Sequence, residues 1–160
     1  MRLRWRGFAV RRDGPGSVQL DPAAARLLRL GTLLQLVDRA VALQEEADAV
    51  IIACGRPGET PGSVARRGRQ VAAEYARIQG WVLDLCEGDE PWSLPRRIGE
   101  LLSYHTEMLD MSLKLAFPRY RSAKLERRRR ALTGLGEPAR TLRETRSALR
   151  IWIDDLEVRP

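Results

Sequence analysis

Hydrophobic residues recur every three to four positions over most of this chain, which is the spacing of amphipathic helices. The pattern is most regular between residues 63 and 85, where steps of four and three alternate. Its members are Val64, Gly68, Val71, Tyr75, Ile78, Val82 and Leu85. Such a stripe lies along one side of a helix and predicts packing against a neighbouring helix.

A longer helix is predicted before it, from Asp21 to Cys54. Asp21 is typical of a helix N-cap, and Pro22 of the first helical position. Two apolar stripes follow, made of Leu27, Leu30, Leu34, Val37 and Val41 and of Leu33, Leu36, Ala40, Leu43, Ala47 and Val50. A helix with two apolar stripes contacts more than one neighbour. We expect the next helix, capped by Ser63, to pack antiparallel against it after a loop at residues 55–62.

Three further helices are predicted in the second half of the chain. Ser93 and Pro95 begin one that ends at Pro118. Its apolar face is Ile98, Leu101, Leu102, Met108, Leu109 and Leu115. Residues 120–132 predict a short basic helix, and Pro138 begins the last one. That helix carries Leu142, Thr145, Leu149, Trp152 and Leu156 at heptad spacing.

The first 20 residues follow a different pattern. Arginines at positions 2, 4 and 6 alternate with Leu3 and Trp5, and a turn is predicted at residues 13–16. We expect residues 1–20 to form a basic N-terminal arm or hairpin and residues 21–160 to form a single helical bundle domain. The predicted fold class is all-α, an antiparallel bundle of four to five helices with a short N-terminal β-hairpin or extended arm.

The net charge of +7 is concentrated in two segments. Residues 1–20 carry five arginines and one aspartate, a net charge of +4. From Arg119 to Gly136 the net charge is +6, and the rest of the chain carries a net charge of −3. Of the 28 basic residues 26 are arginine. The basic segments therefore point to an anionic partner more clearly than the total charge does.

Several other properties limit the function classes. The longest apolar run is Ala49–Cys54, much shorter than the roughly 18 residues that span a bilayer. No apolar stretch follows the first arginines, so we expect a cytoplasmic protein that does not bind membranes. Cys54 and Cys86 are expected at opposite ends of the first two helices, too far apart for a disulfide. The chain has one histidine and two cysteines, and their positions do not match the ligand spacing of a zinc site. We therefore expect no metal and no cofactor.

The basic helix is the clearest candidate site. Consecutive arginines offer several guanidinium groups, whose geometry matches phosphate, and nearby aromatic rings can stack on bases. The predicted nucleic-acid-binding residues are Arg119, Tyr120, Arg121, Lys124, Arg127, Arg128, Arg129 and Arg130, with Arg2, Arg4, Trp5 and Arg6 of the arm. The alternative is that the arginines are solvated or pair internally with Glu87, Asp89 and Glu90.

These residues predict a non-enzymatic helical subunit of a nucleoprotein assembly that binds the phosphate backbone. The alternative is a protein–protein adaptor or regulator acting through helix–helix contacts, and a protein partner or homo-oligomer is expected. A third hypothesis is a helical-bundle nuclease that uses Arg97 and His105, although their spacing is too long for the known arrangement. Two acidic clusters could in principle hold magnesium, one made of Glu45, Glu46 and Asp48 and the other of Glu107 and Asp110. A magnesium site between them is disfavoured, because a loop, a whole helix and another loop separate Asp48 from Glu107.

Overall fold

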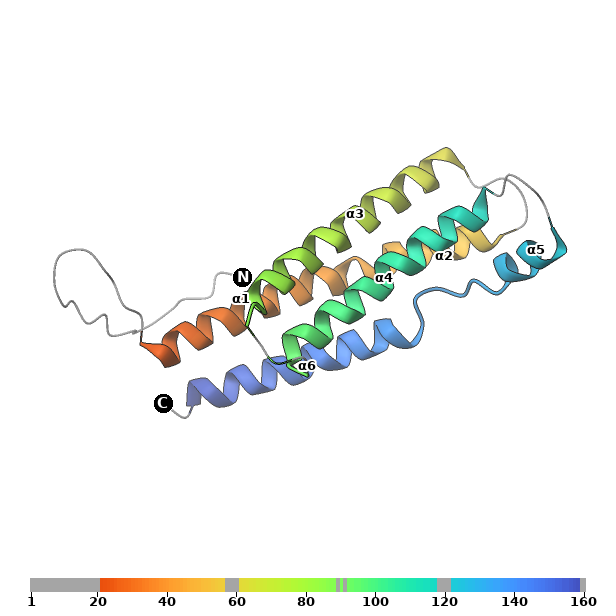
Figure 1. The fold of residues 1–160 in the computed structure, drawn as a ribbon. Helices are drawn as coiled ribbons and strands as arrows, with labels where there is room; N and C mark the ends of the chain where they lie inside the picture. Colours follow the sequence, from red (N-terminus) through yellow and green to blue (C-terminus); the bar gives the residue numbers. More distant parts are fainter. Residues whose placement is uncertain (1–20, 57–60, 89, 91, 118–121, 159–160) are drawn as a thin grey trace.

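The computed structural model describes residues 21–56, 61–88, 90, 92–117 and 122–158. Within these ranges the chain forms six helices and no strand (Figure 1). The helices are α1 (Pro22–Ala42), α2 (Gln44–Gly55), α3 (Gly62–Leu85), α4 (Leu94–Ala116), α5 (Ala123–Arg130) and α6 (Glu137–Val158). The all-α prediction is therefore confirmed, and the predicted N-terminal arm or hairpin lies outside the described residues.

The predicted helix from Asp21 to Cys54 is divided at Leu43, so the expectation of one continuous helix is wrong. Leu43 keeps helical dihedral angles, with φ −80° and ψ −12°, and its backbone N–H donates to the carbonyls of Arg39 and Ala40, both at 3.2 Å. The backbone N–H of Ala47 still donates to the Leu43 carbonyl at 2.9 Å. No glycine or proline stands at this position, so the sequence carries no signal for the break.

Helices α3 and α4 form a closely packed antiparallel pair (Figure 1). The predicted stripe of α3 is buried at Gly68, Val71, Tyr75, Ile78 and Val82. Glycine at position 68 permits this distance between helices, because an added Cβ would lie 2.8 Å from Cγ1 of Val50 and 3.0 Å from Cδ2 of Leu113. Gly68 thus allows α3 to lie close to both α2 and α4.

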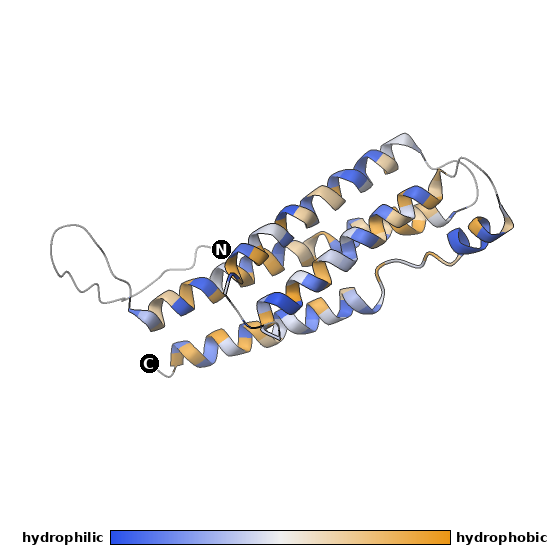
Figure 2. Ribbon diagram, viewed as in Figure 1, coloured by the Kyte–Doolittle hydropathy of each residue, from blue (hydrophilic) through white to orange (hydrophobic). Residues whose placement is uncertain are grey.

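The other side of the bundle is closed by α1 and α6. Helix α6 packs against α1 and α4, and α1 also contacts α3, so the prediction of more than one neighbour for the first helix is confirmed. The residues that α6 buries are Ala139, Leu142, Leu149 and Ile153. Figure 2 shows the alternation of apolar and polar residues along each helix that this packing requires.

The helix boundaries follow capping chemistry in most places. α1 has Asp21 at its N-cap and Pro22 at its first position, although the Asp21 side chain accepts no hydrogen bond from the helix. The Ser93 hydroxyl accepts the backbone N–H of Arg96 at 3.4 Å, as expected for the start of α4. The predicted cap at Ser63 is wrong, because Pro61 occupies the N-cap position and α3 begins at Gly62, two residues earlier than that cap predicts.

Both cysteines are buried. Cys54 lies in the last turn of α2, and Cys86 follows α3 at the opposite end of the bundle (Figure 1). The Cys86 thiol donates a hydrogen bond to the Val82 carbonyl at 2.8 Å. This placement confirms that the two cysteines do not form a disulfide with each other.

None of the helices in the described ranges has both the length and the apolar character needed to cross a lipid bilayer.

The close approach at Gly68 gives a stability prediction. Replacing Gly68 with valine should lower the free energy of unfolding by about 2 kcal/mol, because overpacking of a filled core costs about 1–3 kcal/mol. The matched control is Gly80→Val in the same helix, where an added Cβ meets nothing within 4 Å. That variant should change stability by only a few tenths of a kcal/mol. Urea unfolding of both variants measures the difference, and equal stabilities would show that Gly68 does not set the packing distance.

Candidate functional site

The basic helix α5 lies at the end of the bundle where α4 finishes (Figure 1). It spans Ala123–Arg130 and is shorter than the predicted range of 120–132. Ser122 caps it, with its hydroxyl accepting the backbone N–H of Leu125 at 3.2 Å. Arg119, Tyr120 and Arg121 lie outside the described residues, as do Arg2, Arg4, Trp5 and Arg6 of the arm.

The basic side chains of α5 do not all point the same way. Lys124, Arg127 and Arg128 are exposed. Arg127 and Arg128 follow Lys124 by three and four residues, so the three side chains share one face of the helix. Arg130 is also exposed, but its Nε lies 3.3 Å from Oε1 of Glu126. The solvent-facing set of Lys124, Arg127 and Arg128 is called the α5 basic face below.

Arg129 points toward the bundle. Its side chain is 10% exposed and makes an ion pair with Glu126 at 2.9 Å. The hydrogen bond from Arg129, supported by Arg130, lowers the pKa of the Glu126 carboxyl. Glu126 therefore stays ionised at neutral pH and compensates two of the helix's own arginines.

The contact between α5 and α2 fixes the orientation of the basic face. A Cβ added at Gly55 would lie 3.1 Å from the Arg129 carbonyl and 3.2 Å from the Leu132 carbonyl. Glycine therefore allows the end of α2 to meet the backbone at the end of α5. Arg129 lies on the packed side, and the α5 basic face is left toward solvent.

This contact also brings an unpredicted cation to the site. Arg56 directly follows Gly55, is exposed, and stands at the C-cap of α2 beside α5. Sequence reasoning missed it because a single arginine in a loop carries no distinguishing pattern. Only the tertiary contact at Gly55 places it near the basic helix.

The proposed internal pairing of the basic helix takes a different form from the one expected. Glu87 and Glu90 lie at the opposite end of the bundle, after α3 (Figure 1), and Asp89 lies outside the described residues. Within the described ranges, Arg129 and Arg130 form ion pairs with Glu126 of the same helix. The partner is thus local in sequence.

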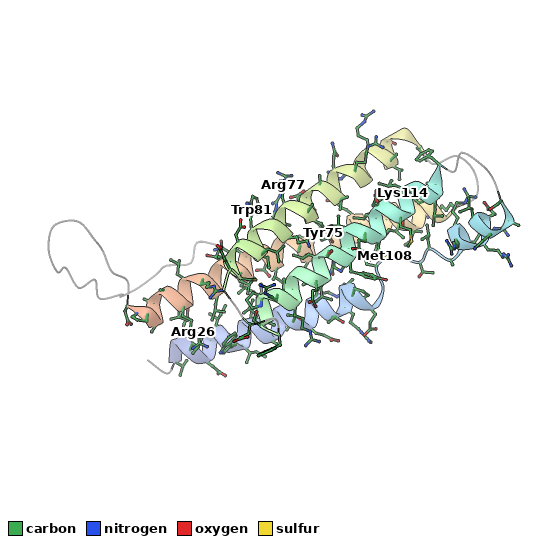
Figure 3. The ribbon with its side chains drawn as sticks, viewed as in Figure 1. Arg26, Tyr75, Arg77, Trp81, Met108 and Lys114 are labelled. Atoms are coloured by element: carbon green, nitrogen blue, oxygen red, sulfur yellow. The ribbon has the colours of Figure 1, made fainter. Side chains whose placement is uncertain are left out.

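The residues of the nuclease hypothesis are placed apart. Arg97 is exposed near the start of α4, whereas His105 is fully buried in the core. The His105 ring meets the ring of Tyr75 edge-on, with centroids 5.2 Å apart (Figure 3 labels Tyr75). In this arrangement His105 has no surface on which to meet a nucleic-acid strand.

Burial governs the protonation of His105. It lowers the pKa of His105 to about 4, outweighing the backbone of Pro138 and the carboxylate of Asp48, which both raise it. Neither ring nitrogen has a hydrogen-bond partner of ordinary geometry among the described residues. The neighbouring Tyr75 hydroxyl donates to the Ala40 carbonyl at 3.2 Å, and burial raises the pKa of Tyr75. Both rings are therefore uncharged at neutral pH.

The acidic residues considered for magnesium have other roles. Oδ1 of Asp48 accepts the backbone N–H of Leu135 at 2.6 Å, beside Gly134 with its φ of +104°. Glu46 forms an ion pair with Arg67, and Asp110 with Lys114. The part of the chain that the structure describes contains no group of three or more histidine, cysteine, aspartate or glutamate side chains that could hold a metal ion.

A second buried contact holds the start of α6. The amide of Gln44, which is 2% exposed, donates to the Ala139 carbonyl at 3.0 Å and accepts from Arg143 at 2.7 Å. Together with the Asp48 contact, it ties α2 to the segment that leads from α5 into α6. These polar groups are structural, because each is already satisfied within the fold.

Comparison of the chain with protein-family models, with curated proteins and with solved structures finds no match.

The buried histidine predicts a pH dependence of stability. Because the pKa of His105 is about 4 in the folded state and 6.5 as its reference value, the unfolded chain takes up the proton first as the pH falls. The free energy of unfolding therefore carries no penalty from His105 above pH 6.5. It falls by about 3 kcal/mol in total as the pH decreases from about 6.5 to 4.

Urea unfolding at a series of pH values measures this effect. The control is His105→Phe, which keeps an aromatic ring against Tyr75 but cannot titrate. Its stability should fall less steeply over the same pH range, whatever its absolute stability. Parallel curves for the two proteins would contradict the assignment of the effect to His105.

Proposed function

We propose that this chain is a non-enzymatic helical subunit of a nucleoprotein assembly in the cytoplasm, and that it binds the phosphate backbone of nucleic acid through α5. The observation that supports this most directly is the α5 basic face. Lys124, Arg127 and Arg128 are exposed on one side of a helix that is anchored by its opposite side.

The geometry suits a phosphate backbone. Phosphate oxygens accept the parallel N–H groups of a guanidinium, and side chains three and four residues apart meet neighbouring anions along a strand. Arg56 extends the same end of the molecule with one more exposed cation. Contacts of this kind fix a protein on a backbone without reading the bases, so binding should depend little on sequence.

Charge compensation within α5 supports the same conclusion. Glu126 pairs with Arg129 and Arg130, which leaves the three residues of the α5 basic face without an ion pair among the described residues. Exposed cations that lack an ion pair can neutralise phosphates and so release the cations that are condensed on the nucleic acid.

The test is a salt titration of binding to duplex nucleic acids of unrelated sequence. Replacing Lys124, Arg127 and Arg128 together with glutamine should weaken binding to all of them. The slope of log K against log salt should become shallower by about 0.9 for each phosphate contact removed. Circular dichroism checks that the fold is retained.

The matched control removes the same charge elsewhere. Arg77, Arg96 and Arg97 are exposed on α3 and at the start of α4, away from α5, and their replacement by glutamine should leave the salt slope nearly unchanged. Equal slopes in both triple variants, or no binding by the unmodified protein at low salt, would contradict the proposed role of α5.

A second candidate function, helix–helix contact with another protein, is favoured by a specific feature of α4. Its residues Leu101, Tyr104, Met108, Met111 and Leu115 follow heptad steps of three and four. Tyr104 and Met111 are 42% and 45% exposed, and the other three are half-buried. Figure 3 labels Met108 on this helix. The set is called the α4 stripe below.

The α4 stripe is not the surface that packs on α3. The α4 residues that contact α3 include Gly99, which lies next to Leu83, and Leu113, which lies next to Gly68. By helical periodicity, Gly99 and Leu113 lie on nearly the opposite side of α4 from the α4 stripe. Leu101 and Met108 pack against the core of the bundle, so Tyr104 and Met111 supply the exposed part of the stripe. We propose a second copy of this chain as the partner of that exposed part.

Light scattering over a range of protein concentrations tests this second candidate. The unmodified protein should self-associate, and a Tyr104→Lys, Met111→Lys variant should be monomeric, because charges on a shared apolar seam repel and must be desolvated. Replacement of Glu107 by lysine, on the same helix beside the stripe, is the control. A monomer at every concentration of the unmodified protein would rule out the second copy.

A further inference from the structure

A cavity of about 420 Å³ opens at the end of the bundle opposite α5. It lies between the first turns of α1, the end of α3, the start of α4 and the C-terminal part of α6. Leu30, Leu33 and Leu85 supply its apolar lining. The volume falls in the range of about 300–1,000 Å³ that is typical of small-molecule sites.

Two tryptophans contribute to its wall. Trp92 precedes α4 and is 81% exposed, while Trp152 of α6 is half-buried. The Cζ atom of Arg26 lies 5.3 Å from the centroid of the Trp152 ring, and Figure 3 shows Arg26 beside α6. This cation–π contact orients the guanidinium while its N–H groups stay available to an acceptor.

The other charged groups of the wall define what can enter. Arg29 adds a second guanidinium, held in place because its Nε donates to the Leu85 carbonyl at 2.7 Å. Glu90 is the carboxylate among the described lining residues. A ligand must therefore put an anionic group near the arginines and away from Glu90, which favours one negative charge over several.

We propose that this cavity binds a small planar aromatic monoanion, such as an aryl carboxylate or sulfonate. The aromatic body lies on the leucines and against the tryptophan rings, where offset and edge-on ring contacts add to hydrophobic burial. The anionic group accepts hydrogen bonds from Arg26. The site is at the other end of the bundle from the α5 basic face, so this proposal does not depend on nucleic-acid binding.

The experiment compares two dyes that share the same rings. Anilinonaphthalene sulfonate carries one negative charge, whereas N-phenylnaphthylamine carries none. The sulfonate should bind the full chain saturably with a stoichiometry of one, and energy transfer from tryptophan should decrease when Trp92 is replaced by phenylalanine. Near-ultraviolet circular dichroism and a thermal melt confirm that each variant is folded.

Three variants locate the charge recognition. Arg26→Gln should weaken sulfonate binding by about tenfold, the scale of one charge-assisted hydrogen bond, and should change binding of the neutral dye by less than twofold. Glu90→Gln should strengthen sulfonate binding alone. Arg77→Gln, which removes an equal charge on α3 outside the cavity lining, should change neither dye.

Two results would overturn the proposal. One is equal binding of both dyes with no response to Arg26→Gln, which would indicate a merely apolar surface. The other is an equal loss of sulfonate binding in the Arg26 and Arg77 variants, which would indicate a response to total charge and no specific site.

Discussion

The distance between α3 and α4 is the constraint on which the rest of this bundle depends. Gly68 brings α3 against Val50 of α2 and Leu113 of α4, and Gly99 of α4 accepts the side chain of Leu83 in the same way. Close packing in a protein interior leaves little room for compensation when such a distance changes. The positions of α2 and α4 then determine where α6 starts, because the Asp48 and Gln44 contacts join α2 to residues 135–139.

The orientation of the basic helix follows from that chain of contacts. The end of α2 meets α5 at Gly55, and the start of α6 is tied to α2 after Gly134. The eight residues of α5 are too few for a stable isolated helix, since helices shorter than about 12 residues are marginal in water. The direction of α5 is therefore determined by its contact with α2 and by the segment that leads into α6. Its own sequence, which is mostly polar, would not hold it in place.

Much of this architecture could be predicted from sequence, and the exceptions have physical reasons. The stripe through Val71 and Ile78 and the cap at Ser93 rest on local rules of period and hydrogen bonding, and both are confirmed. The break at Leu43 leaves the dihedral angles helical, so no residue preference marks it. In the candidate site, the exposed positions of Lys124 and Arg127 follow the helical period. The tertiary contact at Gly55, in contrast, determines that Arg129 points inward and that Arg56 lies near α5.

The placement of the two thiols has a consequence for how local openings of this fold can be distinguished. Cys54 and Cys86 are both buried, and each lies at a different end of the bundle. A thiol reagent reaches Cys54 only when the end that carries α5 opens, and reaches Cys86 only when the end that carries the tryptophan-lined cavity opens. The rates at which the reagent modifies the two cysteines thus report separately on local opening at the two ends, and no cysteine has to be engineered into the chain.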